Sequence, residues 1–283
     1  MPDLKEIVPL AVTGLADYHC HCDYSVDATG SIDDYCRAAL KRNLAEICFT
    51  THYDVNPRSV DGLGQMSVDG EQRPADHESL SMYVEDVRLA HERYYPLGLS
   101  VLLGLEYTWF RGCEEDVQKL KDNFGFDYLL CGVHEIEDIC YCCSHLYERC
   151  FERYSVEKMA ETYFREVTAA AKTRLFNTIA HLDYYRKYGA QYYGQSVHLA
   201  HRPYMNDVFA ALRASGTALE VNTAARRKGL DSFYPQMEII NAARRAGVDV
   251  IHLGSDAHAP EQVGADFEEA SMLVPQIAGG CDD

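Results

Sequence analysis

The chain has 283 residues, of which 47% are hydrophobic, enough for the core of one large α/β domain or two small ones. Its 44 acidic residues outnumber 26 basic ones and give a formal net charge of −18. This balance argues against a nucleic-acid partner, because such proteins need a basic surface to neutralise phosphates. No apolar stretch reaches the roughly 18 residues of a membrane-spanning helix, so no membrane contact is expected.

The chain contains eleven cysteines. The N-terminus shows no basic segment followed by a long apolar stretch, as a secretory signal would. We therefore expect a cytoplasmic, reduced protein in which most cysteines are small buried hydrophobes. Four of them gather at Cys140, Cys142, Cys143 and Cys150. Because they lack the second well-spaced pair typical of zinc or iron–sulfur sites, we expect a loop with incidental cysteines.

Seven short segments rich in Val, Ile, Leu and aromatic residues have the length and composition of buried strands. They cover residues 14–18, 46–50, 100–105, 127–133, 177–180, 217–221 and 249–254.

Helical patterns lie between these strands, over residues 31–41, 155–174, 203–214 and 235–246. Ser31, with Asp34 three positions later, resembles a capping box, and Ser155 is in the N-cap position of the second helix. The last two segments begin with a proline and are followed by a glycine, as at the two ends of many helices.

Alternating strands and helices predict parallel strands, because each crossover between parallel neighbours needs a helix. Seven repeats suit a (β/α) barrel of seven or eight units, with a doubly wound open sheet as the alternative. Two inserts, near residues 54–76 and 135–154, interrupt the rhythm. They follow strands, where barrels carry lids and specificity loops.

Six of the seven predicted strands lead into a residue that can bind a metal. These residues are His19 and His21, His52, Glu106, His134, His181 with Asp183, and Asp256 with His258. The carboxyl ends of parallel barrel strands share one face, so residues far apart in the sequence should converge on one pocket.

A ligand set of imidazoles and carboxylates without thiolates suits Zn²⁺, Mn²⁺ or Fe²⁺ better than Ca²⁺ or Mg²⁺. Seven to nine ligands are too many for one tetrahedral ion, so two or three divalent ions are predicted. Such sites activate water and stabilise displacement at phosphorus, but they also serve amide hydrolysis. The constellation therefore predicts a metal-dependent hydrolase without naming the bond.

These motifs resemble the PHP (polymerase and histidinol phosphatase) family of phosphoesterases over residues 15 to 265. The matching motifs are His19-Cys-His21 followed by Ser25 and Asp27, Thr51-His52, Gly104-Leu-Glu106, Gly132-Val-His134, His181-Leu-Asp183 and Ser255-Asp256-Ala-His258. Residues 163–189 and 219–235 are similar to the histidinol-phosphate phosphatases within the family.

The resemblance implies a single domain over residues 1–283, folded as a distorted, TIM-barrel-like (β/α)7 barrel with a trinuclear site. One metal would be held by His19, His21, Glu106 and Asp256. Glu106 would bridge to a second metal held by His134 and His181, and a third would be held by His52, His258 and Asp27. Asp27 stands where some relatives have histidine. We assign catalytic roles to Asp256 and His52.

The resemblance also implies a small phosphorylated substrate, contacted by Arg186, Lys187 and Arg227. A phosphate dianion favours such donors, and an arginine offers a fork for two oxygens. The predicted reaction is hydrolysis of L-histidinol phosphate to L-histidinol and phosphate, in histidine biosynthesis, by attack of a metal-bridging hydroxide.

One departure from the subgroup leaves the substrate open. Ala225-Arg226 stands where Gly-Leu is frequent, which changes the shape and charge of the pocket wall. The alternatives are a phosphoesterase acting on a nucleotide or cyclic phosphate, and a non-catalytic metal-binding accessory module. The sequence does not predict an oligomeric state.

Overall fold

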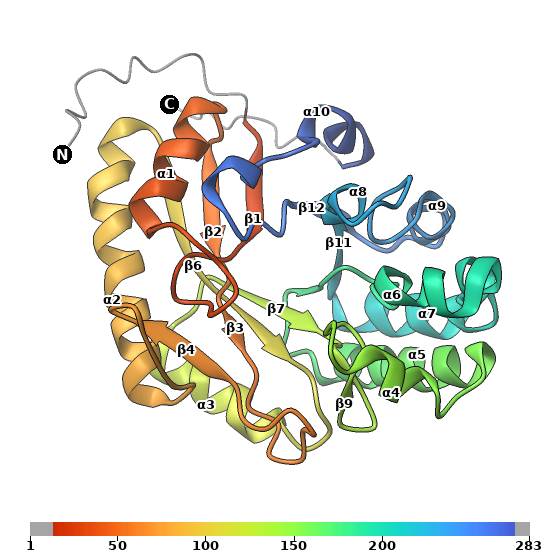
Figure 1. The fold of residues 1–283 in the computed structure, drawn as a ribbon. Coiled ribbons are helices and arrows are strands. Elements are labelled where there is room, and N and C mark those ends of the chain that lie inside the picture. The colour runs from red at the N-terminus through yellow and green to blue at the C-terminus, as the bar shows by residue number, and fades with distance from the viewer. Residues whose placement is uncertain (1–13, 275–283) are drawn as a thin grey trace.

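A computed structural model describes residues 14–274 of the chain, and its centre is a ring of parallel strands (Figure 1). In spatial order the strands are β1 (Ala16–Cys20), β2 (Glu46–Phe49), β6 (Ser100–Thr108), β7 (Tyr128–Gly132), β10 (Thr178–Ile179), β11 (Ala218–Asn222) and β12 (Val250–Gly254). β3 (His52–Tyr53) lies two residues beyond β2 and also pairs with β6.

The end of β12 lies beside β1 and nearly closes the ring. The backbone N–H of Asp256 donates to the His19 carbonyl over 2.8 Å, and the His21 N–H donates to the Ala257 carbonyl over 2.8 Å. Strand order follows sequence order, and a parallel bridge between Cys20 and Ala257 places the end of the last strand beside the first. The predicted seven-stranded barrel is confirmed, and the doubly wound open sheet is wrong.

Helices surround the strands (Figure 1). The longer ones are α1 (Ile32–Lys41), α2 (His77–Tyr94), α3 (Glu114–Phe124), α5 (Val156–Thr173), α6 (Arg186–Tyr193), α7 (Met205–Ser215) and α9 (Met237–Arg245). The short ones are α4 (Tyr147–Phe151), α8 (Ala224–Arg227) and α10 (Phe267–Ala270), with 3₁₀ turns at Tyr95–Leu97, Gly194–Leu199, Arg202–Tyr204, Pro260–Gln262 and Ser271–Leu273.

The predicted helix starts are confirmed for two helices and wrong for two. Ser31 and Asp34 form the capping box of α1, and the Ser155 hydroxyl accepts from a backbone N–H of α5. α7 begins two residues after Pro203, which lies in a 3₁₀ turn. α9 begins two residues after Pro235. Tyr234, the residue before this proline, forms a β-bridge to Asn222 of β11, which keeps the chain extended there.

The two inserts fold and dock on each other. The first contains the antiparallel hairpin of β4 (Gln65–Val68) and β5 (Glu71–Pro74), and the second contains β8 (Glu135–Ile136), β9 (Ile139–Cys140) and α4. Arg58 donates to Asp138 over 3.2 Å, and His145 pairs with Asp61 over 2.9 Å. These contacts join the two inserts.

The cysteines only partly follow the expectation. Eight described cysteines are free and seven of these are buried, but Cys140 and Cys143 form a disulfide. The expectation of a fully reduced chain is wrong for this pair, because the turn after β9 brings the two sulfurs together. No helix among residues 14–274 is long and apolar enough to cross a membrane.

His252 occupies the barrel interior. Its ring lies 4.6 Å from that of Tyr18, and its Nδ1 is 2.7 Å from the Thr178 hydroxyl and 2.9 Å from that of Tyr128. Burial lowers the pKa of His252 to about 4, although the Glu220 carboxylate acts in the opposite direction. The folded protein therefore holds this imidazole neutral.

We expect the free energy of unfolding to fall as the pH falls from about 6.5 to about 4, because only the unfolded imidazole takes up a proton there. His252→Gln should remove this part of the slope, which amounts to about 3 kcal/mol over the full window. Urea titrations of chelator-treated protein at several pH values would measure it. The exposed His77→Gln serves as control, and equal pH slopes in wild type and His252→Gln would contradict the assignment.

Candidate metal centre

The ends of six strands and the loop after β1 bring the nine predicted ligands together. Glu106 lies at their centre. Its Oε2 is 3.4 Å from His19 Nε2, 3.5 Å from His21 Nε2 and 2.9 Å from His52 Nδ1, and its Oε1 is 2.8 Å from His181 Nε2 and 3.4 Å from His134 Nε2.

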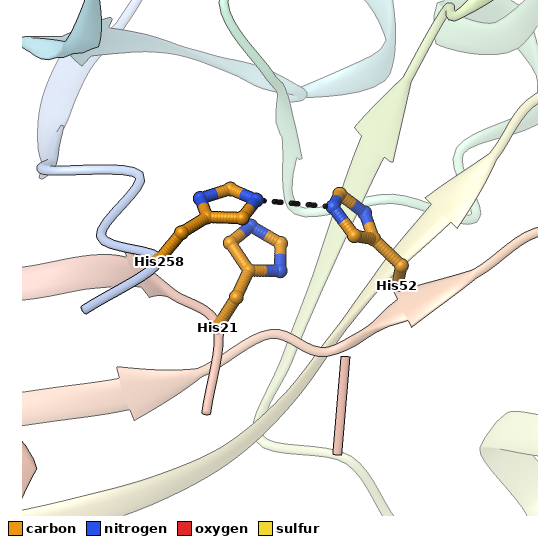
Figure 2. Close-up of side chains that lie close together, drawn as sticks. All are labelled: His21, His52 and His258. Atoms are coloured by element: carbon orange, nitrogen blue, oxygen red, sulfur yellow. Dashed lines mark hydrogen bonds between the residues drawn. The ribbon is translucent and has the colours of Figure 1, made fainter. Parts of the chain in front are cut away.

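Three overlapping groups have ligand atoms within 4.8 Å of one another. They are His19, His21 and Asp256; His19, Glu106 and His181; and His21, His52 and His258. Figure 2 shows the last group, in which three rings from separate segments converge. Because the groups share His19 and His21, the geometry is that of neighbouring ion positions rather than isolated ones.

Asp27 completes the outer side of the third group. Its Oδ2 is 3.4 Å from His258 Nε2 and 3.7 Å from His52 Nε2, and its side chain is 55% exposed. Partial loss of water around the carboxylate opposes ionisation, but His52 and His258 lower the pKa of Asp27 well below its usual range. It is therefore available as an ionised oxygen ligand.

Hydrogen bonds on the far side of several rings fix which nitrogen faces the centre. His19 Nδ1 lies 2.7 Å from Glu220 Oε1, and His258 Nδ1 lies 3.0 Å from the Asp256 carbonyl. Because a carboxylate and a carbonyl can only accept, both Nδ1 atoms carry the proton. Each Nε2 then directs its lone pair at the centre, which is the tautomer that a metal needs.

Two consecutive hydrogen bonds fix the tautomer of His134 in the same way. The Thr108 hydroxyl donates to the Asp54 carboxylate, and Thr108 Oγ1 lies 2.7 Å from His134 Nδ1. With its own proton committed to Asp54, the hydroxyl accepts from the ring. Asp54 begins the first insert, so the insert is tied to a ligand through one hydroxyl.

Several ligand atoms have no hydrogen bond. Within residues 14–274, His19 Nε2, His21 Nε2 and Glu106 Oε2 are buried and make none. Burying such groups without a partner is costly, and a divalent cation among them would satisfy all three. These residues therefore fit divalent metal ions, by their donor types and by their unmet bonding capacity.

The charges around the histidines also fit a site for divalent metal ions. Burial opposes charge on His19, but the carboxylates of Glu220, Glu106 and Asp256 raise its pKa well above the usual range. Burial and the neighbouring rings of His52 and His258 lower the pKa of His21. Without metal the centre holds protons unevenly, and metal binding would displace them.

Backbone constraints at the strand ends leave little freedom. His181 and Asp256 have φ values of 26° and 52°, in the left-handed region that side chains rarely adopt. A Cβ added to Gly254 would lie 1.8 Å from Glu220 Oε1, and one added to Gly132 would lie 2.4 Å from the His134 ring. Both positions need glycine because the ligand shell occupies the space.

Comparison with known families matches the PHP domain over residues 17–224. The chain belongs to the PHP domain family. The resemblance inferred from the motifs is thereby confirmed.

Several known proteins are similar to this PHP protein over most of its length. A Deinococcus radiodurans protein described as a "probable histidinol-phosphatase" is 30% identical over 95% of both chains. A solved Listeria monocytogenes structure has a TM-score of 0.76 at 17% identity, covering 90% of this chain and 99% of that one. The Lactococcus lactis histidinol phosphate phosphatase, solved with zinc, L-histidinol and phosphate, has a TM-score of 0.70 at 21% identity, covering 92% of both.

Two of the three predicted basic contacts border the PHP centre. Arg227 Nη2 donates to the carbonyls of Ser255 and Asp256, and its Nη1 is buried without a hydrogen bond in the described part of the chain. Lys187 Nζ donates to the Cys142 carbonyl over 2.9 Å and to the Tyr184 hydroxyl over 3.2 Å.

Arg186, the third, has a structural environment instead. Its side chain is 2% exposed, its Nε lies 2.8 Å from Asp183 Oδ2, and its Nη2 donates to the Phe233 carbonyl over 2.6 Å. Asp183 is fully buried, and burial raises its pKa to about 6 although Arg186 lowers it. Asp183 and Arg186 therefore form a buried ion pair, and direct substrate contact by Arg186 stays a prediction that these bonds do not favour.

Sequence reasoning missed several supporting residues. Glu220 is 1% exposed and binds both the His19 ring and the backbone N–H of His181, each over 2.7 Å. Asp17 is fully buried and accepts from the N–H groups of Ser255 and Gly264. A carboxylate inside an apolar strand segment was the available signal in both cases.

We expect Glu220→Gln to weaken metal binding by about 10- to 100-fold, because the ligand ring loses a charged acceptor. Competition with a chromogenic chelator and elemental analysis would measure it. Glu46→Gln is the matched control, since Glu46 is the first residue of β2, at the opposite end of that strand from the metal centre, and accepts from the Tyr18 hydroxyl over 2.7 Å. Unchanged metal content in Glu220→Gln would remove Glu220 from the metal centre.

Proposed function

We propose that this chain is a metal-dependent phosphatase that hydrolyses L-histidinol phosphate to L-histidinol and phosphate, a step of histidine biosynthesis in the cytoplasm. The observation that carries the proposal is the buried Glu106 carboxylate surrounded by histidine rings, with the unpaired Arg227 Nη1 nearby. The named relatives support the choice of alcohol, because the Lactococcus lactis structure contains zinc, L-histidinol and phosphate.

We assign two or three divalent ions, of zinc, manganese or iron, to the nine ligands. Support for a bridging Glu106 comes from its two oxygens, since Oε2 faces His19 and His21 while Oε1 faces His134 and His181. The outer position would use His52, His258 and Asp27. The Zn²⁺, Mn²⁺ and Fe²⁺ preference follows from the imidazole-rich set.

The bound ions would supply an activated water and would neutralise charge on the phosphate oxygens. The chain's own residues then orient the ester. Arg227 Nη1 is a free donor for an equatorial oxygen, and its Nη2 bonds hold the guanidinium against the strand end. Asp256 and His52 are assigned to the reaction because they are proposed ligands whose side chains solvent can still reach, being 6% and 23% exposed.

Removal of metals should abolish phosphate release, and adding back Zn²⁺, Mn²⁺ or Fe²⁺ should restore it. The assay is phosphate release from histidinol phosphate, nucleoside monophosphates and cyclic nucleotides by the same preparation. Turnover of nucleotides but not of histidinol phosphate would favour the alternative substrate. No turnover of any ester by metal-replete protein would favour the accessory module.

Arg227→Met should lower kcat/KM by about 10²- to 10³-fold, because one preorganised donor to the transition state is lost. Arg226→Met is a matched control on the preceding residue. The sequence placed Arg226 in the pocket wall, but the structure pairs it with Glu269 over 2.6 Å at the surface, so that expectation is wrong. We expect the control to retain wild-type activity. A similar loss in both variants would mean that the segment matters only structurally.

A further inference from the structure

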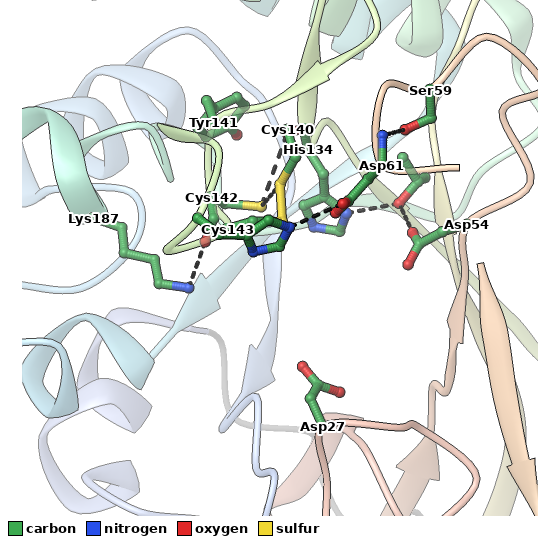
Figure 3. The surroundings of a disulfide bond; sticks show 12 residues. Asp27, Asp54, Ser59, Asp61, His134, Cys140, Tyr141, Cys142, Cys143 and Lys187 are labelled. Carbon is green, nitrogen blue, oxygen red and sulfur yellow. Dashed lines mark hydrogen bonds and ion pairs between the residues drawn. A yellow bond between two sulfur atoms is a disulfide. The ribbon is translucent and has the colours of Figure 1, made fainter. Parts of the chain in front are cut away.

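The turn after β9 gathers three sulfur atoms beside the metal centre. Cys140 and Cys143 form a disulfide, and Cys142 Sγ lies 3.4 Å from Cys140 Sγ (Figure 3). Cys140 is 5% exposed and Cys143 is partly exposed, so a reductant reaches the pair from the Cys143 side. The spacing is Cys-x-x-Cys, which occurs in reversible redox pairs.

This turn contacts a metal ligand. The Tyr141 backbone N–H donates to the His134 carbonyl over 3.2 Å, and the Tyr141 hydroxyl donates to the carbonyl of Val133. The thiol of Cys142 lies 3.9 Å from the same His134 carbonyl. The backbone that carries the ligand and the backbone that carries the disulfide are therefore bonded directly.

The turn also holds Lys187. The Cys142 carbonyl, between the two linked cysteines, accepts from Lys187 Nζ over 2.9 Å (Figure 3). The ammonium lies 5.2 Å from the ring centre of Tyr184, and that ring stacks on His181 at 4.2 Å. Lys187 therefore sits between the turn and the ligand shell, and its orientation depends on where the Cys142 carbonyl points.

We propose that Cys140 and Cys143 are a reversible thiol–disulfide site that sets the affinity of the active site for its phosphorylated substrate by fixing or releasing Lys187. In the oxidised form the closed ring of residues 140–143 holds the Cys142 carbonyl in place. Reduction opens this ring, and the ammonium loses its fixed acceptor.

The chemistry balances with a dithiol as reductant. One dithiol sulfur attacks Cys143 Sγ, the bond to Cys140 breaks, and the Cys140 thiolate takes a proton. The second dithiol sulfur then displaces Cys143 as a thiol, so two cysteine thiols form while the dithiol becomes a disulfide.

The expected effect is on binding. A lysine that must be ordered before it contacts phosphate weakens binding by about three- to tenfold relative to one already held in place. KM for the ester and the inhibition constant of inorganic phosphate should both rise by this factor on reduction, while kcat stays within about twofold. The KM part of this expectation rests on the proposed function.

The test compares oxidised and dithiothreitol-reduced full-length protein, freed of reductant and reloaded with the same metal. Alkylation and mass spectrometry count the thiols and map the pair, and calorimetry measures inorganic phosphate binding. Cys142→Ser should keep the redox response. The double variant Cys140→Ser, Cys143→Ser should bind phosphate as weakly as the reduced wild type does, with or without dithiothreitol treatment. Lys187→Met should bind phosphate weakly and without a redox response.

Equal phosphate affinity of the two wild-type forms would overturn the proposal, and so would a full redox response in Lys187→Met. Failure of mild oxidation to pair Cys140 with Cys143 would overturn it as well. A phosphate shift without turnover of histidinol phosphate would instead refute the proposed substrate and leave this site supported. Chemical reduction of wild type gives the same comparison if the double serine variant does not fold.

Discussion

The rest of the site depends on one buried carboxylate, Glu106. It is fully buried on β6, the longest strand, and pairs in register with His52 of β3. An ionised carboxylate in such a position is unfavourable unless charged or hydrogen-bonding partners surround it. Burial raises its pKa, but His19 and His134 lower it more, so it stays ionised. The barrel supplies these partners by ending its strands around this residue.

A second layer of buried polar groups keeps the rings in place. Glu220 and Thr108 fix the tautomers of His19 and His134, and Asp17 binds the backbone N–H of Ser255 just before Asp256. These groups are buried and hydrogen-bonded, so each is held by the fold rather than by solvent. The left-handed backbone at Asp256 is tolerated because the surrounding bonds determine it.

The strands and the convergence of eight of the nine candidate ligands could be predicted because two simple rules apply to them, whereas Asp27 was predicted only from the family resemblance. Strand segments are apolar runs, and the carboxyl ends of parallel strands share one face. The alternation of inward and outward side chains expected of a strand breaks down in β1, whose pairing with β2 shifts between Asp17 and Cys20. Tyr18 contacts His252, and the next residue, His19, contacts Glu220, which pairs with His252 on the adjacent strand. No period-two pattern predicts two consecutive residues on one surface.

What the sequence could not predict depends on contacts between distant segments. The Asp54–Thr108–His134 relay joins an insert, a strand and a ligand loop. Arg186 and Lys187 are adjacent in sequence, yet one is buried against Asp183 and the other borders the centre. Residue type suggested phosphate binding for both, and only the tertiary structure separates them.

The position of the cations explains how a chain with a net charge of −18 can attract a phosphate ester. Burial lowers the pKa of Lys228, and the positive charges of Lys187 and Arg227 lower it further, although Asp256 and Asp27 act in the opposite direction. Surface charges farther away than about 8–10 Å are largely screened at physiological salt, so the acidic exterior has little influence here. A dianion bound among these groups relieves their mutual repulsion. The same repulsion is a reason for Lys187 to be held by a neutral carbonyl, because an acidic partner there would compete with the substrate.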